Sequence, residues 1–204
     1  MCAQKKKRKC PAKDNLTAIK VGLFFSFVPE FASKLIVRVT GKKLDNKSDA
    51  YSHCGVVFEM SDGKIIYYEA LFSEGFSGPK PIKKLQAKII KNDGRFCFWR
   101  PSLDSAVAEQ VRLRCENWVG TRGYYAWQLA SMWWFERVGR HFGWHVPASP
   151  SKMVCSEACA RSLFPWIDLR DNDHPRFDEV NPNSVYRRTV EIDILGAARW
   201  VCCG

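Results

Sequence analysis

Residues 52–71 read SHCGVVFEMSDGKIIYYEAL, and they contain the clearest hairpin pattern of the chain. Two mostly apolar runs, 53–60 and 64–71, flank the short polar segment 61–63, a pattern that predicts a β-hairpin. The Ser-Asp-Gly segment suits a three-residue loop in which Gly63 takes the left-handed position. The loop length matters because it determines which residues of the two strands face each other.

A three-residue loop places Gly55 opposite Glu69. His53 is then the diagonal neighbour of Glu69 on the same face, about 7–8 Å away, which is within reach of both side chains. A two-residue loop would shift the pairing by one position and send the two side chains to opposite faces. An acid inside the apolar run 65–71 needs a partner or water. The sequence therefore permits a His53–Glu69 pair.

The rest of the chain mixes strands and helices that are partly segregated, which is typical of the α+β class. Apolar spacing, turn residues and helix-stop residues define the expected elements. In chain order they are a strand over 21–28, a helix from Pro29 that Gly41 ends, a loop over 72–82, strands over 85–90 and 95–99, helices over 102–119, 124–140 and 155–164, and a last strand over 189–195.

Length and charge suggest one folded unit that follows a basic arm. The chain has 204 residues, 46% of them hydrophobic, which suits a single domain over 14–204. The formal net charge is +11, and residues 1–13 contain six bases and no acid, so we expect a disordered basic arm there. This arm is typical of nuclear-localisation or nucleic-acid-binding segments, and it also suits an anionic membrane surface. Its continuous basic run is Lys5, Lys6, Lys7, Arg8 and Lys9.

The nine cysteines do not indicate a disulfide framework, because their number is odd and the N-terminal segment lacks the apolar region of a secretory signal. No stretch predicts a transmembrane helix. We expect a cytoplasmic protein with mostly free thiols, or a nuclear one in a eukaryotic host. No cofactor is predicted. His141 and His145 have the spacing of a metal pair, but the segment lacks the Glu of a zincin and stops at Pro147, so no metal site is predicted.

Cys155 stands where a loop passes into a predicted helix. Unpaired amide N–H groups and the helix dipole favour a thiolate at such a place, and the same donors can hold an oxyanion. The alternative is a buried structural cysteine, which is common for this residue type. His53 opens a strand, so its ring can face a cleft. Cys54 should point the other way, into apolar packing with Val56 and Phe58, and be inert.

Together these segments resemble the permuted papain-like hydrolases, relatives of the NlpC-type peptidases, and especially the YiiX-like group. In that group a histidine strand of the form S-H-x-G precedes an acid in a "YEA" strand, and a "CSE" helix start comes much later. The corresponding segments here are 52–57, 68–70 and 155–157. Further similar segments, over roughly residues 20 to 190, are 23–25, 33–36, Thr40 and 177–182. The family's acidic "GD" turn is absent before Leu23, and the Lys-rich tail and Trp-rich middle are not family features.

The resemblance implies a circularly permuted papain-like fold, with a small antiparallel sheet or half-barrel packed against helices. It also implies acyl transfer through a triad. His53 would take the proton of Cys155, the thiolate would attack a carbonyl, and Glu69 would orient the imidazole. The Cys155 N–H is the expected oxyanion donor, and Tyr51 and Ser156 are further candidates for oxyanion or substrate contacts.

Three functions remain open at this point. The first is an amidase or peptidase acting on a peptide or a peptidoglycan fragment. The second is an acyltransferase or thioesterase with an acyl-lipid substrate, since lecithin retinol acyltransferase-like proteins share the permuted order. The third is a non-catalytic basic module that binds nucleic acid or anionic lipid through residues 1–13, with an affinity that falls steeply with salt.

Overall fold

The computed structural model describes residues 16–40, 50–71, 74–123, 153–173, 175–177, 179–194 and 198–203. Within these residues the protein has the expected α+β character. A six-stranded sheet with the order β4-β3-β2-β1-β5-β6 forms its centre, and every neighbouring pair of strands is antiparallel. The strands are β1 (Ala18–Phe27), β2 (His53–Met60), β3 (Ile65–Leu71), β4 (Gly75–Pro81), β5 (Arg95–Pro101) and β6 (Ala198–Cys203).

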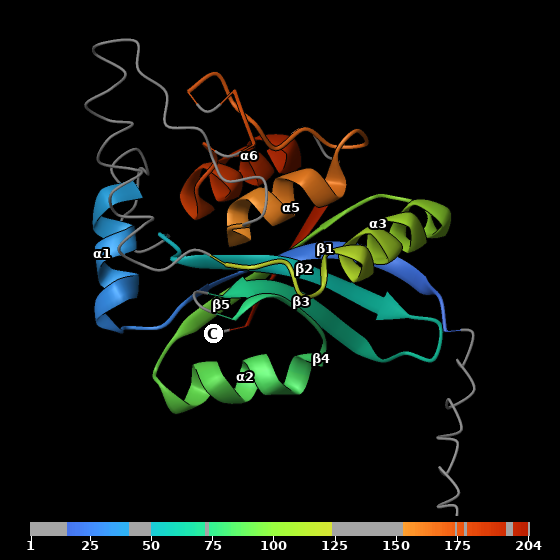
Figure 1. Ribbon diagram of the computed structural model, residues 1–204, viewed down its shortest axis with the longest axis horizontal. Coiled ribbons are helices and arrows are strands. Elements are labelled where there is room, and N and C mark those ends of the chain that lie inside the picture. The colour runs from blue at the N-terminus through green and yellow to red at the C-terminus, as the bar shows by residue number, and fades with distance from the viewer. Residues whose placement is uncertain are drawn as a thin grey trace, which may run out of the picture.

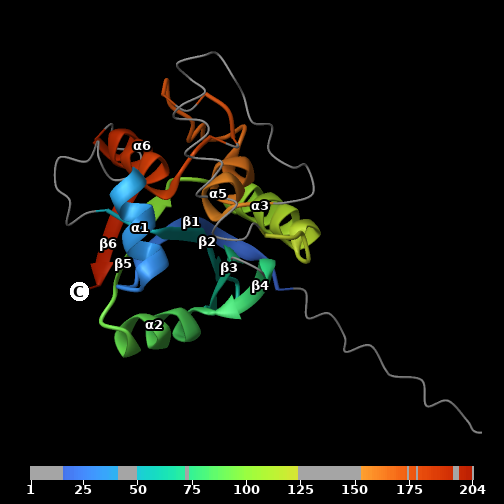
Figure 2. The same ribbon diagram turned by 60° about the vertical axis from the view of Figure 1, so that its left-hand side comes forward.

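Helices cover both faces of the sheet (Figure 1). Helix α2 lies under one face, and α3, α5 and α6 lie over the other, while α1 stands at one end of the sheet (Figure 2). None of the helices in the described ranges is long and apolar enough to cross a bilayer. The helices are α1 (Phe31–Thr40), α2 (Ile82–Lys91), α3 (Ser105–Trp118), α5 (Cys155–Leu163) and α6 (Pro182–Ile194).

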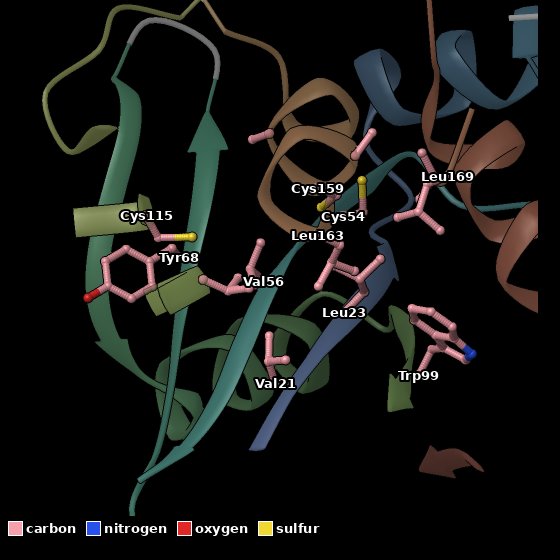
Figure 3. Close-up of a cluster of buried hydrophobic side chains, with 14 of the residues drawn as sticks. Val21, Leu23, Cys54, Val56, Tyr68, Trp99, Cys115, Cys159, Leu163 and Leu169 are labelled. Atoms are coloured by element: carbon pink, nitrogen blue, oxygen red, sulfur yellow. The ribbon is translucent and has the colours of Figure 1, made fainter. Parts of the chain in front are cut away.

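Two hydrophobic clusters lie on opposite faces of the sheet. The larger one joins strands β1, β2, β3 and β5 to α3, α5 and α6, and part of it is drawn in Figure 3. The smaller one joins the other face of the sheet to Leu85 and Ile89 of α2. Because alternate residues of a strand point to opposite faces, each central strand contributes to both clusters. In β1, for example, Leu23 belongs to the larger cluster and Phe24 to the smaller.

The hairpin formed by β2 and β3 has the predicted register. Gly55 faces Glu69, and the backbone N–H of Met60 donates to the carbonyl of Lys64 at 2.8 Å, which closes a three-residue loop. Gly63 has a φ of 79°, the left-handed conformation that glycine adopts without strain. The loop chemistry therefore fixes the pairing on which the positions of His53 and Glu69 depend.

The start of β2 is held in place by α6. The side-chain oxygen of Asn183 accepts from the backbone N–H of Tyr51 at 2.7 Å, and its amide nitrogen donates to the hydroxyl of Thr40 at 2.6 Å. The backbone N–H of Ser52 also donates to the carbonyl of Ser26 in β1 at 3.1 Å. These bonds tie α1, the start of β2 and α6 together, next to His53.

Two predictions for residues 72–91 are wrong. Residues 75–81 form strand β4 where a loop was expected, because an edge strand tolerates the prolines and glycines that suggested a loop. Residues 82–91 form helix α2 where a strand was expected over 85–90. Leu85 and Ile89 are buried four residues apart while the lysines between and around them face solvent, which is helical spacing.

The predicted last strand over 189–195 is also wrong, because α6 continues to Ile194 and the last strand, β6, follows at 198–203. The side-chain oxygen of Asn181 accepts from the backbone N–H groups of Asn183 and Ser184 and so caps α6, and Pro182 suits the first helical position. The predicted helix 102–119 is α3, and it is capped by Asp104 instead of Ser102.

Four sequence predictions fall outside the described residues. They are the helix stop at Gly41, the helix over 124–140, the His141–His145 pair and the basic arm over 1–13.

Candidate active site

His53 is the first residue of β2 and lies at one end of the sheet, with its side chain mostly buried. The ring of Phe24 on β1 packs beside it, with the two ring centroids 5.8 Å apart. Gly55 makes room for this arrangement, since a Cβ there would come within 2.4 Å of the Phe24 ring and 2.5 Å of the carbonyl oxygen of Tyr68. The glycine two residues after the histidine therefore lets Phe24 support the imidazole from one side.

Glu69 on β3 holds the imidazole from the other side. Nε2 of His53 lies 2.9 Å from Oε2 of Glu69, and the carboxylate is buried. Nζ of Lys80, on β4, donates to the second oxygen, Oε1, also at 2.9 Å. Burial would raise the pKa of Glu69, but His53 and Lys80 outweigh it and hold that pKa at about 2. The carboxylate is thus ionised over the whole physiological range.

The same contacts favour the protonated form of His53. Burial acts to lower the pKa of the imidazole, but the negative charges of the Cys155 thiolate and of Glu69 outweigh it and raise the pKa to about 10. Because Nε2 faces Glu69, Nδ1 is the ring nitrogen left for Cys155. An imidazole between a carboxylate and a thiol can carry a proton from one reacting group to another.

Cys155 is the first residue of α5. Val154 before it has an extended backbone and makes no side-chain capping bond, and the first helical bond runs from the N–H of Ala158 to the carbonyl of Val154. The N–H groups of residues 155–157 therefore precede the helical bonding pattern, at the positive end of the helix dipole. This is a suitable environment for a thiolate and for an oxyanion next to it.

The thiol of Cys155 interacts with both His53 and Cys54. The pKa of Cys155 lies well above its usual range, because contact with Cys54 and burial raise it by more than a protonated His53 lowers it. Ionisation of this thiol therefore depends on the histidine. Cys155 is partly exposed, whereas Cys54, Cys97, Cys115 and Cys159 are buried.

Cys54 lies in the larger core cluster with Val56 and Phe58, as the alternation along the strand predicted. Burial also raises its pKa well above the usual range. The prediction missed one contact, because Cys54 also meets the thiols of Cys155 and Cys159 on α5. Strand alternation gives the face to which Cys54 points, but not which residues of a helix about a hundred positions later lie over that face.

A cavity of about 130 Å³ opens at this end of the sheet, and His53, Glu69 and Cys155 all line it. Most of its remaining wall is apolar and comes from the segment after β1, from α1, α2 and the end of β3, and from the residues just before α5. These apolar residues include Val28, Ile36, Leu85 and Ile89. A substrate group that reaches Cys155 would therefore contact aliphatic side chains as well as the three polar groups.

The two other candidate residues lie differently. The Tyr51 ring is buried against Phe25 and Tyr186, and Tyr51 is not among the described residues that line the cavity. Ser156 lines the cavity, but its hydroxyl donates to the carbonyl oxygen of Val180 at 2.7 Å. The Ser156 hydroxyl thus anchors α5 to the segment before α6, which leaves its backbone N–H as the group that can serve an oxyanion.

Lys80 was not identified from the sequence, because residues 72–82 were expected to form a loop. It faces Tyr67 in the β3–β4 ladder, and a shift of register follows before Glu69 pairs with Ser77. Recognition of an edge strand that pairs with β3 would have placed a lysine beside Glu69.

Comparison with known proteins supports the fold. No protein-family model matches the chain, and no curated protein matches it significantly in sequence. Among solved structures, the metalloprotein YiiX from Escherichia coli O157:H7, a DUF1105 protein, is similar with a TM-score of 0.50 and 16% sequence identity, over 76% of this chain and 70% of that one. At this identity the likeness concerns the fold alone. In the part of the chain that the structure describes, no group of three or more His, Cys, Asp or Glu side chains is arranged to hold a metal ion.

Proposed function

We propose that this protein is a cysteine-dependent hydrolase that works through an acyl-enzyme, with Cys155 as nucleophile, His53 as base and Glu69 as the acid that orients His53. The observation that carries the proposal is their convergence on one cavity, with His53 in contact with both Cys155 and Glu69. The similarity of fold to YiiX agrees with the family resemblance in the sequence. The three residues come from β2, β3 and α5.

The reaction follows from the positions of these groups. His53 takes the proton of the Cys155 thiol, which gives an imidazolium–thiolate pair, and the Sγ of this thiolate then attacks the carbonyl carbon of the substrate. The negative charge that develops on the carbonyl oxygen is held by the backbone N–H groups at the start of α5, including that of Cys155. His53 then gives the proton to the leaving group, and a water molecule hydrolyses the thioester with His53 again as base.

An amide is the substrate bond that this arrangement suits best, as part of a peptide or a peptidoglycan fragment. An amine is a poor leaving group unless it is protonated as it departs. Glu69 stabilises the imidazolium, so that the proton that His53 has taken from Cys155 is available to the departing amine. An ester or thioester needs this proton less.

A matched set of acyl-amide and acyl-ester probes tests the proposal. We expect turnover of an amide probe and a covalent acyl adduct on Cys155, detected by peptide mapping of enzyme quenched with acid. Cys155→Ala should form no adduct, and His53→Ala should form it far more slowly. An adduct at another cysteine, or full turnover by Cys155→Ala, would refute the assignment.

A second candidate, transfer or hydrolysis of a lipid acyl group, is favoured by the surface around the cavity. Helices α1 and α2, which both line it, expose large apolar side chains: Phe31 is 85% exposed, Leu35 42% and Ile90 77%. The two helices contain no acidic residue. Exposed apolar groups among bases are typical of helices that lie in the surface of an anionic membrane. The bases are Lys34, Arg38, Lys83, Lys84, Lys88 and Lys91.

Vesicle binding separates the two candidates. If the substrate is a membrane lipid, the full chain should sediment with phosphatidylserine-containing vesicles, and the double variant Phe31→Ser/Ile90→Ser should bind several-fold less. Leu113→Ser is the matched control, because Leu113 is 46% exposed on α3, away from the cavity. Equal binding by both variants would remove the support for a lipid substrate.

A further inference from the structure

Three thiols meet under the start of α5. Cys54 comes from β2, whereas Cys155 and Cys159 lie one turn apart on α5, and the thiol of Cys54 contacts both of the others. Figure 3 shows Cys54 and Cys159 side by side in the core. The proposed hydrolysis uses only the first of the helix thiols, which leaves the role of Cys54 unexplained.

Access to the three thiols differs. Cys155 lines the cavity and is partly exposed, so a small oxidant can reach it. Cys54 and Cys159 are both 0% exposed. Because Cys54 has no exposed surface, an oxidant in solution cannot reach its thiol directly. An oxidant that enters the cavity therefore meets Cys155 first.

We propose that Cys54 is a resolving cysteine, which forms a reversible disulfide with Cys155 after a peroxide has oxidised Cys155. In the first step the Cys155 thiolate takes one oxygen from hydrogen peroxide, which gives a sulfenic acid and, with one proton, releases water. In the second step the sulfur of Cys54 attacks the sulfenic sulfur. The sulfenic hydroxyl and the Cys54 proton leave as a second water, and the S–S bond forms.

Geometry favours Cys54 over Cys159 as the partner. Residues four apart on a helix keep their Cβ atoms about 5–6 Å apart. A disulfide needs Cβ atoms about 3.5–4.5 Å apart, so a bond between Cys155 and Cys159 would distort the first turn of α5. Cys54 approaches from another element, the strand on which α5 packs, and this restriction does not apply to it.

The disulfide would have two effects. It would occupy the sulfur that the proposed hydrolysis needs, and it would stop oxidation before the irreversible sulfinic acid. Only the loss of activity rests on the proposed function. The disulfide itself is measured without a substrate. A failure of the disulfide proposal can therefore be distinguished from a failure of the proposed hydrolase function.

The test uses the full-length reduced protein and a small excess of hydrogen peroxide. Peptide mapping by mass spectrometry without reductant should find the peptide that contains Cys54 joined to the peptide that contains Cys155. The mass of the joined species should be roughly 2 Da below the summed masses of the two reduced peptides, because two hydrogen atoms are lost. Dithiothreitol should separate them and restore any turnover. Cys159→Ser is the matched control, and it should form the same link.

Cys54→Ser is the decisive variant. Without a resolving thiol, Cys155 should pass to the sulfinic acid, roughly 32 Da heavier, and dithiothreitol should not reverse the change. Circular dichroism verifies that the variant is folded. The proposal is overturned if Cys54→Ser is oxidised as reversibly as the parent, or if Cys159→Ser prevents the link. A link that forms in a protein with no measurable hydrolase activity would leave this proposal standing and count against the proposed function alone.

Discussion

The Nε2 atom of His53 lies 2.9 Å from Oε2 of Glu69, although Gly55 is the residue that faces Glu69 across the β2–β3 ladder. The two side chains meet along the diagonal, over the space that the missing side chain of Gly55 leaves to the ring of Phe24. The pairing thus depends on the hairpin register and on a neighbour without a side chain.

Replacement of Glu69 by Gln should narrow the pH range of activity from its alkaline side. The carboxylate helps to raise the pKa of His53 to about 10, so its removal lowers this pKa and the imidazolium is lost at a lower pH. We expect kcat to fall on the order of 10²-fold. The pH profile of kcat/KM is the measurement, with Glu59→Gln on the same hairpin as the control. An unchanged alkaline limb would mean that Glu69 is purely structural.

Replacement of Lys80 by Met should destabilise the protein at neutral pH but not in strong acid. Glu69 has a depressed pKa of about 2 against an ordinary 4.5, so its contribution to stability is present above pH 4.5 and is lost as the pH falls through 2. The loss at pH 7 should be about 1.5 kcal/mol, since one hydrogen bond to a charged group is removed. Urea unfolding at pH 7 and at pH 2 measures the loss of unfolding free energy. An equal loss at both pH values would show that Lys80 does not act through the charge of Glu69.

Iodoacetamide at limiting concentration near neutral pH should label Cys155 before Cys54 or Cys159. Cys155 has the helix N-terminus, the imidazole and the cavity, whereas the other two thiols are buried. Cys155→Ala should lower turnover on the order of 10³-fold or more. Cys115→Ala, a change in the same core but away from the cavity, should reduce stability and leave turnover intact. Preferential labelling of Cys54 would remove the basis of the assignment.

Gly55→Ala should destabilise the fold and disturb His53 together. The new Cβ would meet the ring of Phe24 at 2.4 Å and a backbone carbonyl at 2.5 Å, an overpacking that costs about 1–3 kcal/mol. A second change, Phe24→Leu, removes the ring and should recover part of the lost stability. It should not recover activity, because His53 then lacks the ring that packs beside it. Chemical denaturation and turnover are measured for Gly55→Ala and for the double variant with Phe24→Leu. Full recovery of turnover in the double variant would contradict a supporting role for the Phe24 ring.

Deletion of residues 2–13 should leave turnover of a small neutral substrate within a few fold. The expectation rests on the sequence, since the bases of the arm precede every candidate catalytic residue by many positions. Loss of turnover in a variant with an unchanged circular dichroism spectrum would show that the arm takes part in the chemistry.

Local chemistry predicted much of the site. The Ser-Asp-Gly loop gave the register that brings Glu69 to His53, and the start of α5 at Cys155 was predicted at the same residue. Both depend on short stretches of sequence. The contact between Cys54 and α5, and the ion pair of Lys80 with Glu69, depend on how elements distant in the chain pack.

The errors in secondary structure have two different causes. Residues 189–195 alternate between apolar and polar side chains, which favours a strand in isolation. The cap at Asn181 and Pro182 begins a helix that continues through the alternating segment. In 75–81 the opposite happened, because a ladder with β3 overrides a composition typical of loops. A cap that lies outside the segment thus decided 189–195, whereas tertiary pairing decided 75–81.

The order of the site's parts along the chain has a consequence for biosynthesis. His53 and Glu69 belong to one local hairpin, whereas Cys155 follows His53 by 102 residues. At about 5–20 residues per second, a ribosome would need roughly 5–20 s to add the nucleophile after the base has emerged. A nascent or prematurely terminated chain would thus hold the base and its acid without the reactive sulfur. Such a chain could not attack its surroundings before α5 is made.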